Sequence, residues 1–442
     1  MNQRQHYKIG IVCALCTMMC ALCTMMACSS SDTTQDGGYG KTQDSVPIAG
    51  EHLLGFTARL ANESSAQAAP ASRVTRAVGS GELTTELLRN VGFGVYCWYT
   101  GAAPFGTITP AEASFMLMRN QRVVWDAALS HPSWTYSPSK YWPLEENHLL
   151  TFRAYAPYVS YNLVEAVVTN PGTYTSGMPL LPVVVGAEDY KNGTQHDPLW
   201  GTGKLVNSAT GEYYPENPAP PEEPLYPDNK RYGTLYDDIT FKESGDWRLT
   251  ADTRDGFIDW YFHHGMAKLV FNCYITPEPG CSKVVIHEIK VSPLYKQGLL
   301  DISSPTEKTT DKPYWYDRDG NMTVDLDATC LAANPNPMEI SIDDQTATTG
   351  PVSLLSSGLL IIPRDYTSGT PMTIKITYSI DSETDQLEAT ATLNDQIFYG
   401  NTVYTLGLSL TPETKGLKID IVQAAFNVWE EGGFGSHTVY NW

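Results

Sequence analysis

Residues 72–101 read SRVTRAVGSGELTTELLRNVGFGVYCWYTG and join a basic site to the beginning of a strand. Arg73 and Arg76 follow a run of small and polar residues, which is typical of a mobile linker that proteases can reach. From Phe93 to Tyr99 the chain is rich in aromatic and β-branched residues, which predicts a strand. The stretch therefore predicts a cleavable linker, a polar spacer and then a strand of a β domain.

A second strand is predicted upstream, within residues 51–60. Its apolar residues alternate with other residues, so one face of the strand carries Leu54, Phe56, Ala58 and Leu60. The linker 61–76 follows directly. One strand is thus predicted to be tethered to its domain by a loop that a protease can cut.

This arrangement resembles the fimbrillins, the pilus subunits of Gram-negative gut and oral bacteria. In that family a lipoprotein precursor is cut after an arginine, its first strand is lost, and a strand from a neighbouring subunit fills the groove. The step Thr75-Arg76-Ala77 looks like the cleavage region, with Ala77 as the first residue of the mature protein. Arg73 is the nearby alternative cleavage site.

Further blocks of sequence resemble the same family in the same order. They are WTY at 134–136, KYWP at 140–143, LTFRAYAP at 150–157, IDWYFHHGMAKLVFNCYI at 258–275, and a final strand that reaches Trp429. The resemblance implies an all-β protein with two β-sandwich domains of transthyretin-like topology. The expected divisions are a signal peptide at 1–27, a lipid-anchored tether at 28–50, an N-terminal domain at 51–257 with a removable part at 51–76, and a C-terminal domain at 258–442.

Composition supports the all-β expectation and excludes some partners. The chain has 26 Tyr, 29 Pro and 35 Gly and lacks long amphipathic helical patterns, which is typical of β proteins with many turns. The formal net charge of −20 repels phosphate backbones and anionic lipid headgroups. Nucleic acid is therefore not an expected partner.

The N-terminus reads as an export signal. Two positive charges, on Arg4 and Lys8, precede an apolar run, and Ala27-Cys28 resembles the end of a lipobox. Cys28 is therefore the expected lipidated residue, and Cys20 fits less well. An uncleaved membrane anchor is the alternative.

Four cysteines follow Cys28, namely Cys97, Cys273, Cys281 and Cys330. Cys273 and Cys281 flank a short Pro/Gly turn at hairpin spacing, and export permits a disulfide between them. A buried free thiol on a strand is the alternative reading.

The candidate metal-binding and phosphate-binding motifs each lack residues or geometry that such a site requires. His263 and His264 are adjacent on a predicted strand, so they point to opposite faces, and we expect one to be buried and the other exposed. Residues 317–321 (DRDGN) lack the glycine and closing carboxylate of a calcium loop and favour a hairpin turn. Residues 201–204 lack the hydroxyl residue of a phosphate loop. No metal or cofactor is expected.

The C-terminus is the expected donor strand. Gly432-Gly433 can serve as a hinge, and residues 434–442 (FGSHTVYNW) place Phe434, Thr438, Tyr440 and Trp442 on one face. The alternative is that these residues form an ordinary edge strand of their own domain.

The resemblance implies a structural or adhesive pilus subunit without enzymatic activity. Its expected partners are other fimbrial subunits, the outer membrane through the lipid anchor, and a ligand on a host or bacterial surface. The alternative is a monomeric surface lipoprotein that binds glycan through exposed aromatic residues of the block 134–157. Buried packing of that block is the favoured reading, because Leu150, Phe152 and Ala154 alternate along a strand.

Overall fold

The computed structural model describes residues 53–60, 83–103, 115–143, 148–161, 163–166, 178–192, 197–206, 257–276, 282–302, 315–327, 338–341, 349–355, 358–381, 385–413, 416–428 and 437–439. Within these residues the regular structure is almost entirely β-strand, with two short helices, α1 (Thr85–Val91) and α2 (Ala187–Asn192). The predicted all-β class is confirmed.

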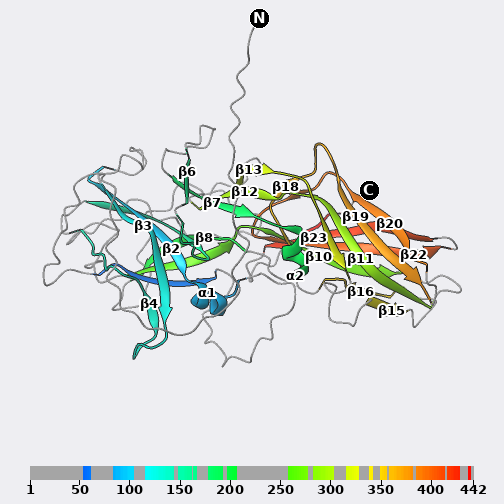
Figure 1. Ribbon diagram of the computed structural model, residues 1–442, viewed down its shortest axis with the longest axis horizontal. Coiled ribbons are helices and arrows are strands. Elements are labelled where there is room, and N and C mark those ends of the chain that lie inside the picture. The colour runs from blue at the N-terminus through cyan, green and yellow to red at the C-terminus, as the bar shows by residue number, and fades with distance from the viewer. Residues whose placement is uncertain are drawn as a thin grey trace, which may run out of the picture. The chain divides into compact units, whose positions relative to one another are not determined.

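The first sheet contains the predicted removable strand. Its order is β1-β9-β8-β5-β2-β3-β4. Figure 1 labels β2, β3, β4 and β8 of this sheet. The strands are β1 (Gly55–Leu60), β9 (Phe257–His264), β8 (Leu199–Val206), β5 (Leu149–Ala156), β2 (Phe93–Gly101), β3 (Phe115–Asp126) and β4 (Ser133–Thr135). β1 lies at the edge and runs parallel to β9, whereas the other neighbouring pairs are antiparallel. Among the described strands, β9 alone therefore pairs with β1 along its length.

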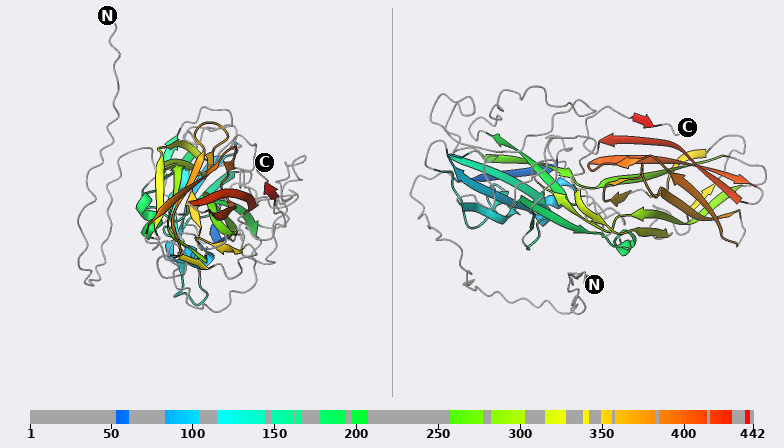
Figure 2. Two further views of the ribbon diagram at one scale, coloured as in Figure 1. Left: turned by 90° about the vertical axis from the view of Figure 1, so that its right-hand side faces the viewer. Right: turned by 90° about the horizontal axis from the view of Figure 1, so that it is seen from above.

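The later part of the chain forms two larger sheets. One has the order β16-β10-β22-β23-β24, with β17 also on β10, and the other has the order β14-β11-β19-β20, with β15 also on β11. Figure 2 shows the long antiparallel pair β22 and β23 in orange and red. The bounds are β10 (Ala267–Ile275), β11 (Lys283–Leu294), β14 (Met322–Asp327), β15 (Met338–Ser341), β16 (Thr349–Ser353), β17 (Leu359–Ile361), β19 (Met372–Ile380), β20 (Leu387–Leu393), β22 (Thr402–Glu413), β23 (Gly416–Val428) and β24 (His437–Val439).

Two smaller sheets complete the described structure. One has the order β13-β12-β7-β6, and the other is the pair β18-β21. The strands are β6 (Val164–Ala166), β7 (Met178–Val184), β12 (Gln297–Asp301), β13 (Trp315–Asp319), β18 (Arg364–Asp365) and β21 (Ile397–Phe398). The β7–β12 pairing joins residues from both predicted domains in one sheet. The predicted boundary at 257 and 258 stays a prediction, and the sheet that contains β1 extends to His264 at the end of β9.

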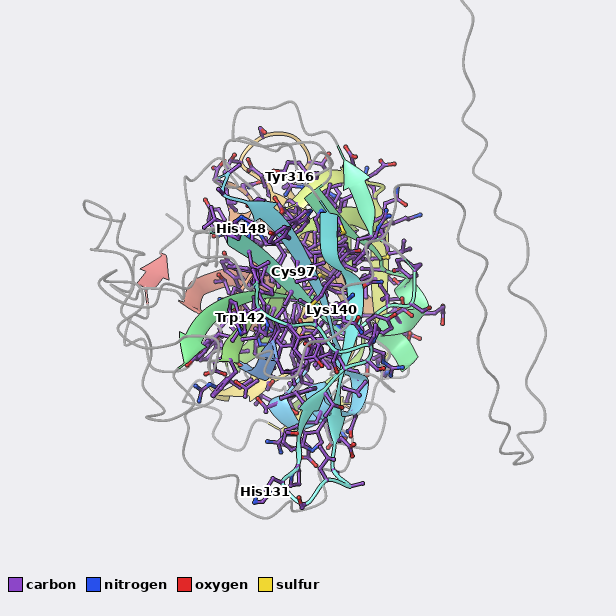
Figure 3. The ribbon with its side chains drawn as sticks, turned by 90° about the vertical axis from the view of Figure 1, so that its left-hand side faces the viewer. Cys97, His131, Lys140, Trp142, His148 and Tyr316 are labelled. Carbon is purple, nitrogen blue, oxygen red and sulfur yellow. The ribbon has the colours of Figure 1, made fainter. Side chains whose placement is uncertain are left out.

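The buried apolar residues form two clusters, and β2 contributes to both. Phe93, Val95 and Cys97 belong to the cluster that includes the apolar residues of β1, which we call the β1 core. Tyr96 and Trp98, on the opposite face of β2, belong to the larger cluster. Figure 3 labels Cys97 together with Trp142, another member of the β1 core. The first sheet is therefore covered on both faces at β2.

The neighbouring strand β5 shows the same double burial. Leu150, Phe152 and Ala154 belong to the β1 core, as the sequence predicts, while Tyr155 on the other face joins the larger cluster. The Tyr155 ring lies so close to β2 that an ideal Cβ added to Gly94 would lie 2.3 Å from it. A glycine at position 94 is what permits this contact.

The predicted polar spacer before Phe93 is wrong for residues 85–91, which form α1. Thr84 caps the helix, because its hydroxyl accepts a hydrogen bond from the Leu87 amide. Leu88 is fully buried in the β1 core. Gly92 ends the helix at φ +71°, where a Cβ would lie 2.5 Å from a backbone oxygen of Val123.

The hairpin expected at residues 317–321 is also wrong. The chain does turn there, with Gly320 at φ +80°, but β13 pairs with β12 and β14 pairs with β11. The turn therefore connects strands of two different sheets. Asp-Gly turn chemistry predicts where the chain reverses, and it does not specify which strands pair afterwards.

Candidate functional site

The candidate site is the position of β1 at the edge of the first sheet, which we call the β1 site. β1 pairs with β9 in parallel register, from Gly55 opposite Phe257 to Leu60 opposite Phe262. The inward side chains are 0% exposed for Leu54, 5% for Phe56, 8% for Ala58 and 1% for Leu60. The alternation predicted from sequence is thus seen, and these four residues belong to the β1 core.

The aromatic block contributes the other wall of the β1 site. The Phe56 ring lies 5.4 Å from the ring of Tyr136 and 6.2 Å from the ring of Phe152, centroid to centroid. Trp142, whose ring is 6.4 Å from that of Phe152, is 3% exposed. Trp134 is 8% exposed. The predicted buried packing of this block is confirmed for these residues.

Backbone contacts hold the beginning of β1. The Leu54 amide donates a hydrogen bond of 2.9 Å to the carbonyl oxygen of Lys140. The Tyr136 hydroxyl donates one of 2.6 Å to the carbonyl oxygen of Leu54. Leu53 also forms an isolated antiparallel bridge with Tyr141. The start of β1 therefore lies between β9 and the loop that contains residues 136–141.

The end of β1 contacts the helix that follows the linker. The Leu60 amide donates to the Thr85 hydroxyl at 3.1 Å. The amide of Leu83, just before the helix, donates to Asp197 at 3.0 Å. The described residues on either side of the segment 61–82, Leu60 and Leu83, are therefore both bound to the folded structure. Arg73, Arg76 and Ala77 lie in that segment, outside the described residues, so the cleavage site stays a prediction.

On the face of β1 opposite the β1 core, four polar side chains form a connected row. The row consists of Thr57 and Arg59 on β1 and of Asp259 and Tyr261 on β9. Thr57 donates to Asp259 at 2.6 Å, and Arg59 donates to both Asp259 and Tyr261, each at 2.6 Å. The Arg59 guanidinium also lies 4.7 Å from the centroid of the Tyr261 ring. Sequence reasoning missed this row, because the two-residue period puts Thr57 and Arg59 on a common face without indicating what they contact.

A buried contact between a histidine and a carboxylate lies at the other end of β9. His264 Nδ1 is 2.7 Å from Asp197 Oδ2, and their side chains are 2% and 0% exposed. The neighbouring His263 ring stacks on Trp200 at 4.6 Å and is also 2% exposed. The expectation that one histidine is exposed is therefore wrong, because both faces of the sheet are covered at this point.

The cysteines in the described residues are buried thiols. Cys97 and Cys273 are free, and burial raises the pKa of both thiols above their ordinary value. This favours the free-thiol reading for Cys273. Cys28 and Cys281 lie outside the described residues. The described residues contain no group of three or more His, Cys, Asp or Glu side chains arranged to hold a metal ion.

The predicted donor segment lies partly within the described structure. β24 pairs in antiparallel register with β23 of the same chain, with Thr438 opposite Ala425. Phe434, Tyr440 and Trp442 lie outside the described residues. Of the two described helices, neither has the length and apolar character needed to cross a membrane.

Comparisons with known proteins give matches among solved structures alone. No family model and no curated protein matches the chain. A fimbrial protein from Bacteroides vulgatus is 19% identical, with a TM-score of 0.49 and coverage of 85% of this chain and 99% of that one. A protein from Bacteroides uniformis, provisionally named a cell adhesion protein, is 11% identical, with a TM-score of 0.38 and coverage of 87% and 100%. These two proteins, both from Bacteroides, are what the chain is similar to in fold.

Proposed function

We propose that this protein is a structural or adhesive subunit of a fimbria. It is exported as a lipoprotein through Cys28, matured by Arg-specific cleavage between Arg76 and Ala77, and polymerised by strand exchange at the β1 site. The observation that carries the proposal is the position of β1: an edge strand with a fully apolar inner face, joined to the rest of its sheet through a linker that contains two arginines.

The energetics favour replacement of β1 over an empty site. Each large apolar side chain removed from water contributes about 1.5–3 kcal/mol, and β1 buries Leu54, Phe56 and Leu60 almost completely. Loss of β1 would also expose the backbone edge of β9, which pairs readily with another strand. A mature subunit therefore gains free energy when a strand of another subunit enters.

Cleavage of the linker determines when β1 can be replaced by a strand of another subunit. While the linker is intact, β1 rebinds at a high effective concentration, so a strand from another subunit competes poorly. After the cut, β1 is a separate peptide, and dilution removes that advantage. Assembly is thereby coupled to processing.

The proposed donor is the C-terminal segment 434–442, attached through Gly432-Gly433. To act as donor it has to leave β23, with which β24 pairs over residues 437–439. Such a short pairing costs little to open compared with the apolar surface that a donor can bury.

The glycan-binding alternative gains no support from the aromatic block. Trp134 and Trp142 are buried and pack inside the β1 core, so their faces are not available to a sugar. A non-enzymatic structural role accords with the similarity to fimbrial and adhesion proteins.

The test begins with purified full-length precursor and an Arg-specific protease. We expect release of the fragment that contains β1, followed by a ladder of polymers on gels run without boiling. The matched control is the Arg73→Ala/Arg76→Ala variant, which should remain monomeric. If the wild-type protein loses β1 and still stays monomeric at high concentration, polymerisation by strand exchange is wrong. Mass spectrometry of the membrane-bound precursor tests the anchor, since a lipid on Cys20, or none, contradicts the role of Cys28.

A further inference from the structure

In the polar row on the face of β1 opposite the β1 core, side chains of β1 donate hydrogen bonds to the nearly buried carboxylate of Asp259. The side chain of Asp259 is 9% exposed, and that of Arg59 is 29% exposed. Asp259 Oδ1 accepts the hydrogen bond from Thr57, and Oδ2 accepts the one from Arg59. Both carboxylate oxygens are therefore contacted by side chains of the strand that the proposed function removes.

The register makes these contacts specific to positions along the strand. Thr57 lies directly opposite Asp259, and Arg59 lies directly opposite Tyr261. From that position Arg59 reaches back to Asp259 and also contacts the Tyr261 hydroxyl and ring. The Thr57 hydroxyl and the Arg59 guanidinium, two residues apart on one face of β1, are thus matched to Asp259 and Tyr261 of β9. If the strand shifted by one residue along β9, both polar side chains would point toward the β1 core.

Removal of β1 would take away these contacts together. A carboxylate with so little access to water depends on hydrogen-bond donors and on opposite charge, because desolvation disfavours its ionised form. Loss of β1 therefore removes two hydrogen-bond donors from a carboxylate that has little access to water.

We propose that Asp259 and Tyr261 select the strand that enters the β1 site. The preferred strand carries apolar residues toward the β1 core and, on its other face, a serine or threonine followed two positions later by an arginine. This inference rests on the proposed function, in which β1 leaves, and adds the chemistry of the partner. The apolar residues supply affinity for any amphipathic strand, and the polar row sets which strand and which register is accepted.

The C-terminal segment of this chain lacks the polar pattern that Asp259 and Tyr261 would select. When Thr438, Tyr440 and Trp442 face the β1 core, the other face presents His437, Val439 and Asn441. That face has neither a hydroxyl residue nor an arginine at the matching positions. The C-terminal segment of this chain therefore offers the apolar contacts without the polar ones, so we expect it to bind a β1 site less tightly than a strand that carries both.

Fluorescent synthetic peptides test the selection directly. Full-length protein is cleaved, the protease is inhibited, and the released β1 fragment is exchanged for a labelled peptide of residues 52–60. Peptides with Arg59→Met, Arg59→Lys and Thr57→Val, and a peptide of residues 434–442, are then compared by anisotropy. We expect Arg59→Met to weaken binding by about tenfold or more, because a hydrogen bond to a charged group is lost. Arg59→Lys should recover part of that loss, and the 434–442 peptide should bind more weakly than the native one.

The matching protein variant is Asp259→Asn. On this protein the difference in affinity between the native and Arg59→Met peptides should shrink, because only the contacts of Arg59 with Tyr261 remain. A merely structural role of Asp259 would weaken both peptides equally and keep the difference between them. Equal binding of these two peptides to wild-type protein overturns the selection and leaves the proposed function intact. Failure of every peptide, the native one included, overturns both. The peptide series on wild-type protein decides the question even if the Asp259→Asn variant does not fold.

Discussion

The Tyr136 hydroxyl donates a hydrogen bond of 2.6 Å to the backbone carbonyl oxygen of Leu54. This bond joins the removable strand to the aromatic loop. Burial raises the pKa of the Tyr136 phenol, so the hydroxyl stays protonated and can donate across the physiological range. We expect Tyr136→Phe to destabilise the precursor by about 1–3 kcal/mol, because the carbonyl of Leu54 loses its donor.

Urea unfolding measures this effect. The matched control is Tyr161→Phe, at a side chain that is 51% exposed, which should change the free energy of unfolding very little. Tyr136→Phe should also speed the release of β1 after cleavage. An unchanged release rate would show that the bond does not hold the strand.

Substitution of Phe56 should lower the stability of the precursor and leave the stability of the polymer unchanged. Phe56→Ala removes a nearly buried ring from the β1 core and should cost the precursor about 3–5 kcal/mol. Once β1 has been replaced, residue 56 is absent, so polymer stability should not change. Phe152→Ala, at a residue of the same core that is retained, should weaken both. Thermal melts of precursor and polymer distinguish these patterns, and a polymer weakened by Phe56→Ala would mean that β1 stays in place.

Processing should depend on the linker arginines. Arg76→Ala combined with Arg73→Ala is expected to abolish maturation, whereas Arg59→Lys should leave it unchanged. Arg59 lies within β1 and is bound to Asp259 and Tyr261, so the folded chain protects the bond that follows it. Sequencing of the mature N-terminus checks the site, and any first residue other than Ala77 contradicts the predicted cut.

Deletion of residues 434–442 should leave proteolytic processing of the precursor intact and stop growth of the polymer. Cleavage is expected to proceed normally, because the linker is untouched, while polymers should stop growing for lack of a donor. Size-exclusion chromatography of the cleaved variant gives the readout. Normal polymers from the deletion variant would exclude this segment as donor.

Alkaline pH should destabilise the folded protein through its buried phenols. Burial raises the pKa of Tyr155, whose hydroxyl donates to Asn120 at 2.5 Å. An unfolded tyrosine loses its proton near pH 10, whereas the folded one keeps it. The folded state then binds more protons, so its stability falls as pH rises above about 10, by roughly 1.4 kcal/mol per pH unit for each such group.

Urea titrations between pH 8 and pH 11 test this dependence. Tyr155→Phe lowers stability at every pH, and it should also make the decline above pH 10 shallower. A decline of the same steepness in the variant would assign the effect to other groups.

Local sequence patterns were sufficient to predict that the chain consists mainly of strands and which side chains share a face of a strand. The two-residue period of residues 54–60 identified all four buried side chains of that segment, since alternation depends on backbone geometry alone. The linker arginines and the acidic composition were likewise readable directly from the sequence. The helix α1 was missed, because seven residues with one fully buried leucine give too little periodicity to distinguish a helix from a spacer.

The tertiary structure decided which strands pair with one another and which faces of the sheets are covered. β1 lies beside β9, whose residues are about 200 positions later in the chain, so no local signal could place Arg59 next to Asp259. Tertiary packing buried Tyr155 of β5 and both His263 and His264 of β9, whereas alternation along β9 had suggested that one of the two histidines is exposed. A strand's own sequence determines which side chains share a face, whereas the partner of each face depends on contacts that form only when distant segments fold together.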